Sequence, residues 1–138
     1  MFDIGAFPFL LKKGKIYIMI VTSTSGKSWI LPKGHPEDDL NKSQVAQLEA
    51  YEEAGIKGNI IDTKLSKEFK RDKDDILIIY PLFIKKILDE WPEQEIRERR
   101  LVTVKEALKL ITKKEHVDAI KYFSTPEMIK KICKGNNK

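Results

Sequence analysis

The segment Ile76–Leu88 constrains the fold of this chain most strongly. Its first part, Ile76–Ile84, is the longest apolar run in the 138 residues; Pro81 interrupts it and Lys85 ends it. Strands that are apolar on both faces lie in the middle of a sheet. We therefore expect a long central strand here. The run is too short and too broken to cross a membrane.

Shorter stretches rich in β-branched and aromatic residues predict the strands around it. They are Ala6–Leu11, Lys15–Thr22, Trp29–Leu31, Asn59–Leu65, Glu68–Arg71 and Arg100–Thr103. Polar and glycine-rich segments predict turns or loops between them. These are Lys13-Gly14, Ser23–Ser28, the corner Pro32-Lys33-Gly34, Asp72–Asp75 and Asp89–Glu98.

Four helices are expected, and capping signals support all but the one at Glu115–Phe123. They cover about Ser43–Ala54, a segment from Thr103 to about Ile111, Glu115–Phe123, and a segment after Thr125-Pro126. A mixed sheet with a few helices belongs to the α/β (α+β) class. The length suits one domain covering residues 1–138.

Charge and cysteine content narrow the setting. The net charge is +5, which would attract a polyanion, but much of the excess lies in tail lysines that can simply be solvated. These are Lys130, Lys131, Lys134 and Lys138. Cys133 is the only cysteine, so no disulfide can form within the chain. With no secretory signal in the first residues, we expect a cytoplasmic protein.

Glu49, Glu52 and Glu53 carry the clearest chemical signal. Their i, i+3, i+4 spacing puts three carboxylates on one face of the predicted helix. Like charges this close repel one another unless a cation lies between them, and Mg²⁺ or Mn²⁺ prefers such oxygen ligands. Considered alone, the spacing favours a solvated acidic face paired with lysines, because such glutamate clusters are common on helices.

The surrounding spacing favours the metal site. The stretch GHPEDDLNKSQVAQLEAYEEAGI, residues 34–56, resembles the Nudix box G-x5-E-x7-R-E-U-x-E-E-x-G-U, where U is a bulky apolar residue. Six positions match the box: Gly34, Glu49, Glu52, Glu53, Gly55 and Ile56. The flanking segments look like the diphosphoinositol-polyphosphate and diadenosine-polyphosphate branch of the Nudix hydrolase superfamily. The resemblance implies a Nudix-type mixed β-sheet sandwiched between helices.

The resemblance also implies an activity and residue roles. The family cleaves pyrophosphate bonds with the help of divalent metal ions, here Mg²⁺ or Mn²⁺. Glu49, Glu53 and the backbone carbonyl of Lys33 would be metal ligands. Glu52 would be the catalytic base that holds or deprotonates the attacking water. A further carboxylate often comes from a distant loop; the candidates are Glu90, Glu93 and Glu95.

Three positions depart from the box. Leu40 replaces its first Glu, Leu48 its Arg, and Ala50 its bulky apolar residue. In the family, the Arg commonly braces the loop and helix through ion pairs. We hypothesise a paired exchange in which Leu40 packs on Leu48, because replacing a whole ion pair by apolar residues is often neutral. The competing interpretation is that the glutamates are less well oriented and activity is weak.

Basic and hydroxyl side chains suggest how phosphates are held. The predicted substrate-binding residues are Ser23, Thr24, Lys27, Lys33, Arg71 and Arg97. For any single Lys or Arg, a solvated surface charge is the favoured interpretation. Trp91 could stack on a base or pack on the sheet edge. The predicted partner is therefore a small-molecule polyphosphate, with no membrane involved.

Two alternatives remain open. A catalytically weak Nudix domain could bind a nucleotide or polyphosphate as a sensor, and Leu40 and Leu48 keep that possibility alive. Removal of pyrophosphate from RNA 5′ ends is chemically close. RNA ranks below a small polyphosphate because no aromatic-studded basic groove is visible in the sequence. The exact substrate and the oligomeric state are not encoded in any feature we recognise.

Overall fold

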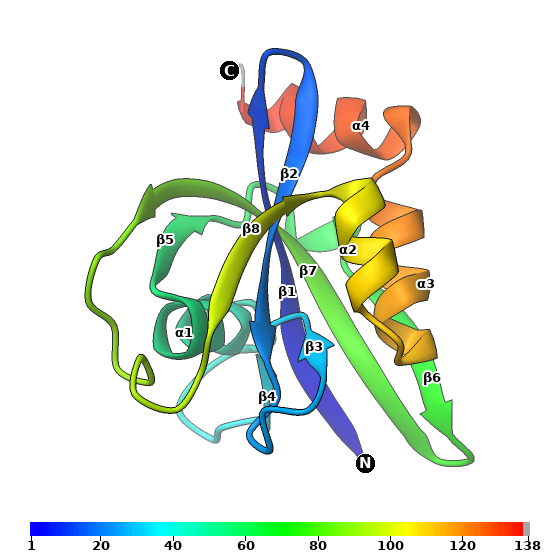
Figure 1. Ribbon diagram of the computed structural model, residues 1–138. Helices are drawn as coiled ribbons and strands as arrows, with labels where there is room; N and C mark the ends of the chain where they lie inside the picture. The colour runs from blue at the N-terminus through cyan, green and yellow to red at the C-terminus, as the bar shows by residue number, and fades with distance from the viewer. Residues whose placement is uncertain (137–138) are drawn as a thin grey trace.

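The computed structural model describes residues 1–136, which are organised around one mixed sheet (Figure 1). Lys138 lies outside the described residues. The strands are β1 (Phe2–Lys12), β2 (Lys15–Thr22), β3 (Trp29–Ile30), β4 (Lys33–Gly34), β5 (Ile56–Asn59), β6 (Lys67–Asp72), β7 (Asp75–Ile87) and β8 (Arg99–Thr103). The helices are α1 (Lys42–Ala54), α2 (Val104–Leu110), α3 (Lys114–Phe123) and α4 (Pro126–Asn136), with a short 3₁₀ helix, η1, at Thr63–Leu65.

The long apolar segment forms β7, a central strand as predicted. It runs parallel to β1, while β5 and β6 pair with it antiparallel. The sheet order is β3-β2-β1-β7-β5, with β4 on β1, β6 on β7 and β8 on β2. One parallel pair among antiparallel ones makes the sheet mixed.

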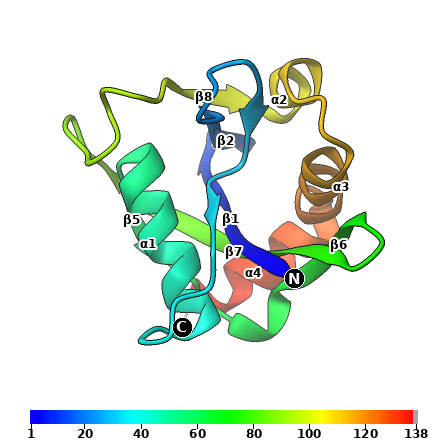
Figure 2. The same cartoon turned by 90° about the horizontal axis from the view of Figure 1, so that it is seen from below.

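Helices cover both faces of this sheet, as the fold prediction requires. In Figure 2, α1 lies on one side of β1 and β7, and α2 and α3 lie on the other. Alternation along the strands supplies both layers. On β1, Ile4 and Ala6 join the core under α1, while Phe7 and Phe9 join the core under the C-terminal helices.

Most predicted elements are present, although β1 begins four residues before its predicted start, and two predictions are wrong. The corner Pro32-Lys33-Gly34 was expected to be irregular, but Lys33–Gly34 pairs with β1 as the short strand β4. Asn59–Leu65 was expected to be a strand, but β5 ends at Asn59 and η1 follows. Asp62 caps η1 by accepting a hydrogen bond from the Lys64 amide. Local side-chain capping therefore outweighs the apolar content of this stretch.

Within residues 1–136, no helix combines the length and the apolar character needed to cross a membrane.

Candidate active site

Helix α1 presents the acidic stripe, and its two ends fix its position. Asn41 caps the N-terminus in a capping box with Gln44. Gly55 ends the helix with φ 66°, a left-handed conformation that glycine adopts without steric cost. The buried residues Ala46, Ala50 and Ala54 face the sheet. Small residues bring the helix close to the sheet, so Ala50, at the box position of a bulky residue, is part of this packing.

The corner before α1 is set by β1. Strand β4 pairs with β1 through Gly5↔Lys33 and Ile4↔Gly34. Gly34 lies directly against the Glu49 side chain: a Cβ atom built at Gly34 would approach the two carboxyl oxygens of Glu49 to 2.5 and 2.6 Å. The box glycine is thus required by close approach to the first helix glutamate.

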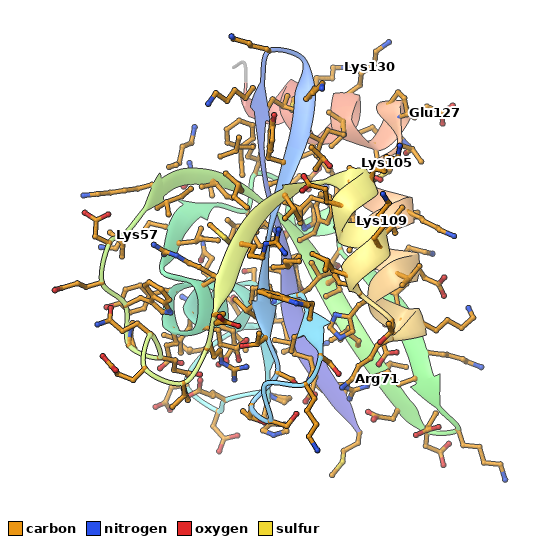
Figure 3. All side chains as sticks on the ribbon, in the orientation of Figure 1. Lys57, Arg71, Lys105, Lys109, Glu127 and Lys130 are labelled. Carbon is orange, nitrogen blue, oxygen red and sulfur yellow. The ribbon has the colours of Figure 1, made fainter. Side chains whose placement is uncertain are left out.

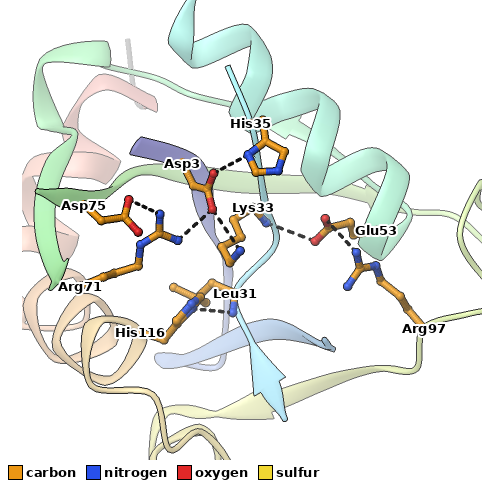
Figure 4. Close-up of polar contacts among 9 residues, drawn as sticks. All are labelled: Asp3, Leu31, Lys33, His35, Glu53, Arg71, Asp75, Arg97 and His116. Carbon is orange, nitrogen blue, oxygen red and sulfur yellow. Dashed lines mark hydrogen bonds and ion pairs between the residues drawn. The ribbon is translucent and has the colours of Figure 1, made fainter. Parts of the chain in front are cut away.

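Glu53 is the most buried member of the stripe. Its Oε1 accepts a hydrogen bond from the Lys33 amide at 3.2 Å, and its Oε2 accepts one from Arg97 Nη2 at 3.2 Å. Figure 4 shows these two contacts on either side of the carboxylate. The carboxylate is therefore held between the corner and the loop that precedes β8.

Glu49 and Glu53 share one site. Burial raises the pKa of Glu49 to about 8, and the neighbouring charges of Glu53, Glu52 and Glu93 add to the effect. Burial also raises the pKa of Glu53, although Arg97 and the Lys33 amide oppose this. Because the cation and the amide beside Glu53 favour its charged form, we expect a proton taken up by the pair to reside on Glu49.

A cleft of about 710 Å³ opens over this pair. Its lining includes Thr24, Glu37 and Glu93 in addition to the corner, Glu49 and Glu53, whereas Glu52 is not one of the lining residues. Burial, then the charges of Glu93 and Glu37, raise the pKa of Glu52. Of the three loop carboxylates considered as distal candidates, Glu93 is the one that lines the cleft. Its amide also donates to the Glu52 carbonyl at 3.0 Å, which ties the loop to α1.

A second cluster adjoins the cleft and was missed from the sequence. The buried carboxylate of Asp3 accepts from Lys33 Nζ at 3.2 Å and from Arg71 Nη1 at 2.8 Å, and its other oxygen lies 2.8 Å from His35 Nδ1 (Figure 4). Arg71 also binds Asp75 at 2.6 Å. The available signal was a single acidic residue inside an otherwise apolar strand. Glu37, which lines the cleft, was also missed. It occupies a variable position of the box, so nothing in the sequence marked it as a site residue.

The structure gathers only some of the predicted substrate-binding residues. Thr24 and Lys33 line the cleft, whereas Arg71 faces an adjoining hollow of about 520 Å³. Ser23 lies in the β2–β3 turn, where its hydroxyl accepts from the Ser28 amide. Lys27 is an exposed residue of the same turn.

Arg97 lies in the cleft wall, but its three nitrogens all donate to protein oxygens.

Trp91 stacks against Arg99, whose guanidinium carbon lies 3.8 Å from the ring centroid. Trp91 therefore packs on a residue of β8, and stacking of Trp91 on a base stays a prediction. Elsewhere the positive charge is dispersed: Figure 3 shows Lys57, Lys105 and Lys130 extending outward from three different elements.

The apolar brace hypothesised between Leu40 and Leu48 stays a prediction. Leu40 packs against the core cluster under α1, together with Phe2 and Ile60. Leu48 is partly buried on α1. Packing against the core therefore accounts for the position of Leu40 without a contact to Leu48.

The donor chemistry of the site fits a hard divalent cation. Glu49 and Glu53 place carboxyl oxygens side by side, and their raised pKa values mark an excess of negative charge that a cation would relieve. Among residues 1–136, no three His, Cys, Asp or Glu side chains already converge on one point. The expected third ligand is the Lys33 carbonyl, a backbone atom, and Glu49 must lose its proton before it can bind a metal.

Fold and site together define the class of this protein. Residues 3–123 match the NUDIX domain family, and the chain belongs to it. It is 34% identical to Nudix hydrolase 16, mitochondrial, of Arabidopsis thaliana over 67% of this chain and 57% of that protein. It is 28% identical to the human diphosphoinositol polyphosphate phosphohydrolase NUDT4B over 68% of this chain and 53% of that protein.

A solved structure, the Ap4A hydrolase of C. elegans, superposes with a TM-score of 0.69 at 19% identity, covering 89% of this chain and 95% of that one. At this identity the likeness establishes the fold alone. The chain spans about half to two thirds of the length of the curated relatives it matches.

Proposed function

We propose that this chain is a divalent-metal-dependent pyrophosphohydrolase that cleaves a phosphoanhydride bond in a small polyphosphate. The observation that carries the proposal is the placement of Glu49 and Glu53 together at the cleft, with Glu49 directly against Gly34 and Glu53 accepting from the Lys33 amide. Two neighbouring buried carboxyls repel each other when both are ionised, which lowers the stability of the fold. Carboxyls with perturbed pKa values of this kind cluster at functional sites.

The proposed metal ligands are Glu49, Glu53 and the Lys33 carbonyl. A Mg²⁺ or Mn²⁺ ion held there would supply positive charge against the phosphate oxygens and make the attacking water more acidic. The Lys33 amide and Arg97 keep the Glu53 carboxylate oriented while this happens. Glu93, from the β7–β8 loop, adds a further carboxylate to the cleft lining.

Glu52 is the proposed general base. Its raised pKa, due to burial and to the charges of Glu93 and Glu37, makes it a better proton acceptor than an ordinary glutamate at neutral pH. It would take a proton from water as the water attacks phosphorus. Phosphoryl transfer otherwise depends on positioning and charge stabilisation, which the cleft supplies.

The proposed substrates are dinucleoside polyphosphates or diphosphoinositol polyphosphates. Support comes from the functions of two similar proteins, an Ap4A hydrolase and a diphosphoinositol polyphosphate phosphohydrolase. Thr24, Ser23 and Lys27, on the turn beside the cleft, and Arg71, beside Asp3, are the proposed phosphate-binding groups. We further propose a reducing compartment such as the cytoplasm, from the single cysteine.

The test is product analysis on a substrate panel with Mg²⁺ or Mn²⁺. The panel holds diadenosine polyphosphates, inositol pyrophosphates, nucleoside triphosphates and triphosphorylated RNA. Glu52→Gln and Glu53→Gln are expected to lower kcat by about 10²-fold or more, in line with the usual effect of general acid–base groups. Glu95→Gln, an exposed change in the same loop as Glu93, is the matched control and should leave turnover unchanged.

Each alternative has its own signature in this experiment. Turnover that survives Glu52→Gln and Glu53→Gln would overturn the site assignment. Saturable binding of a polyphosphate without any product would select the sensor function. Preference for triphosphorylated RNA over every small substrate would select the RNA 5′-end activity.

A further inference from the structure

The box arginine is absent from α1, yet the buried carboxylate of Glu53 has a cationic partner. That partner is Arg97, which comes from the loop before β8. The side chains of Arg97 and Glu53 are 7% and 4% exposed, so the pair is almost completely removed from water. A buried carboxylate that loses its only cationic partner is strongly destabilised, which makes this contact more consequential than a surface ion pair.

Arg97 joins three parts of the site. Its Nη2 donates to Glu53 on α1, its Nε donates to Glu93 at 2.7 Å, and its Nη1 donates to the Thr22 carbonyl at the end of β2 at 2.8 Å. The planar guanidinium suits such a task, because its donors point in fixed directions. One side chain thus sets the spacing between the helix carboxylates and the distal carboxylate.

The backbone around Arg97 is itself held in place. The Arg97 amide donates to the Glu93 carbonyl at 3.0 Å. The next residue, Glu98, exchanges hydrogen bonds with Thr22: the Thr22 amide donates to the Glu98 carbonyl and the Glu98 amide donates to the Thr22 hydroxyl, both at 3.0 Å. Arg97 is therefore presented to the carboxylates by a pinned loop and does not have to be recruited by substrate.

We propose that Arg97 is a positioning residue that braces Glu53 and Glu93 from the β7–β8 loop, in place of an arginine at position 48 of α1. This inference rests on the proposed metal site. It replaces the expectation that Arg97 binds substrate phosphate. It also explains why Leu48 is tolerated, since the brace has moved to a different element.

The test separates positioning from phosphate binding. We would measure Mn²⁺ binding calorimetrically without substrate, together with kcat and KM, for Arg97→Met and Arg97→Lys. Loss of a side chain that orients a ligand typically costs about 10–100-fold in metal affinity or activity, so Arg97→Met should weaken Mn²⁺ binding and lower kcat by that factor with KM little changed. Arg97→Lys keeps the charge but cannot donate to three oxygens in fixed directions, so an intermediate loss is expected.

Arg100→Met is the matched control, because it removes an exposed guanidinium three residues away. It should leave Mn²⁺ affinity unchanged. As a rescue, Arg97→Met combined with Leu48→Arg and Leu40→Glu restores the box residues. It should recover part of the lost Mn²⁺ affinity.

Two results would overturn the inference. One is a raised KM with unchanged Mn²⁺ affinity, which would make Arg97 a substrate ligand. The other is full Mn²⁺ affinity in Arg97→Met or, if that variant does not fold, in Arg97→Lys. Failure of the proposed function gives a different result. If the wild-type protein binds Mn²⁺ but cleaves no member of the panel, the enzyme assignment is wrong. The Mn²⁺ affinities of the Arg97 variants still decide the role of Arg97 in that case. Wild-type protein that binds no Mn²⁺ refutes both.

Discussion

The amide of Leu31 donates a hydrogen bond of 3.0 Å to Nδ1 of His116, which joins α3 to the corner that precedes the candidate metal helix. His116 is completely buried. Because Nδ1 accepts, the imidazole is neutral with its hydrogen on Nε2, and that nitrogen has no hydrogen-bond partner among the described residues. The corner holding Lys33 is thus supported from the helical layer on the far side of the sheet.

Acid should destabilise the protein through His116. Burial lowers its pKa to about 3, and Lys33, Lys113 and Arg71 add to the shift. The unfolded chain takes up a proton below about 6.5 while the folded protein does not, so the free energy of unfolding should fall as pH drops from 6.5 towards 3. The expected slope is up to about 1.4 kcal/mol per pH unit. Urea denaturation between pH 4.5 and 7.5 measures it.

His116→Asn is the matched variant, because its amide oxygen can accept from Leu31 but does not titrate. Its stability should depend less on pH than that of the wild type. Equal slopes for the two proteins would contradict a neutral buried His116.

Glu49→Gln should stabilise the metal-free protein at pH 8. The pKa of Glu49 is raised from 4.5 to about 8, so the folded protein holds a proton that the unfolded chain releases. The free energy of unfolding of the metal-free wild type therefore falls as pH rises from 4.5 to about 8. Glutamine at position 49 does not ionise, so the variant does not lose this stability. Because Glu49 is only half-buried, we expect a gain on the order of 1–3 kcal/mol at pH 8 and almost none at pH 5.

Thermal melts without metal at pH 5 and pH 8 measure the stability gain of Glu49→Gln. Melts with saturating Mn²⁺ measure how much metal stabilises each protein. Metal should stabilise the wild type more than Glu49→Gln, because a ligand stabilises only the state that binds it. A variant that is less stable than metal-free wild type at pH 8 would refute the expectation that Glu49 holds a proton.

Gly34→Ala should impair the site without unfolding the protein. The added Cβ would collide with the Glu49 carboxyl, which can swing away because it is the end of a flexible side chain. Small misplacements of a catalytic group cost about 10²-fold in rate, so a loss of that order in kcat is expected, with a stability change within about 1 kcal/mol.

Gly14→Ala should behave in the opposite way. Gly14 has φ 78° with nothing within 4 Å of a new Cβ, so alanine there strains the β1–β2 hairpin and leaves the site intact. Steady-state rates and melting temperatures of the two variants provide the comparison. Normal turnover in Gly34→Ala would show that the glycine is not needed to seat Glu49.

Asp3→Asn should destabilise the protein by about 1–3 kcal/mol at neutral pH, since it leaves Lys33 and Arg71 without their shared carboxylate. Burial alone would raise the pKa of Asp3, but these two cations lower it. The contribution is therefore present above pH 3.8 and disappears as pH falls through the lower folded-state pKa.

The control is Asp75→Asn, which removes a more exposed partner of Arg71 and should cost less. Denaturant titrations at pH 7 and pH 3 separate the two variants. Equal losses at both pH values would show that Asp3 acts through packing and not through its charge.

Local signals in the sequence were enough to predict most of the helices and strands of this protein. The capping signals at Thr103 and Thr125-Pro126 and the apolar run of β7 depend on neighbours in the chain, so they predicted these helices and the central strand. The spacing of Glu49, Glu52 and Glu53 likewise fixes a shared helix face. These features are set by backbone geometry within a few residues.

The partners of the site were decided only by tertiary structure. The choice of Glu93 among three loop carboxylates, the capture of Arg97 by Glu53, and the gathering of Lys33 and Arg71 around Asp3 all join residues far apart in sequence. The physical reason is burial: a charge removed from water must find a partner, and which one is within reach depends on how the sheet folds the chain. The sequence alone therefore determined the candidate metal-binding helix and its candidate chemistry, while the folded sheet decided which side chains surround it.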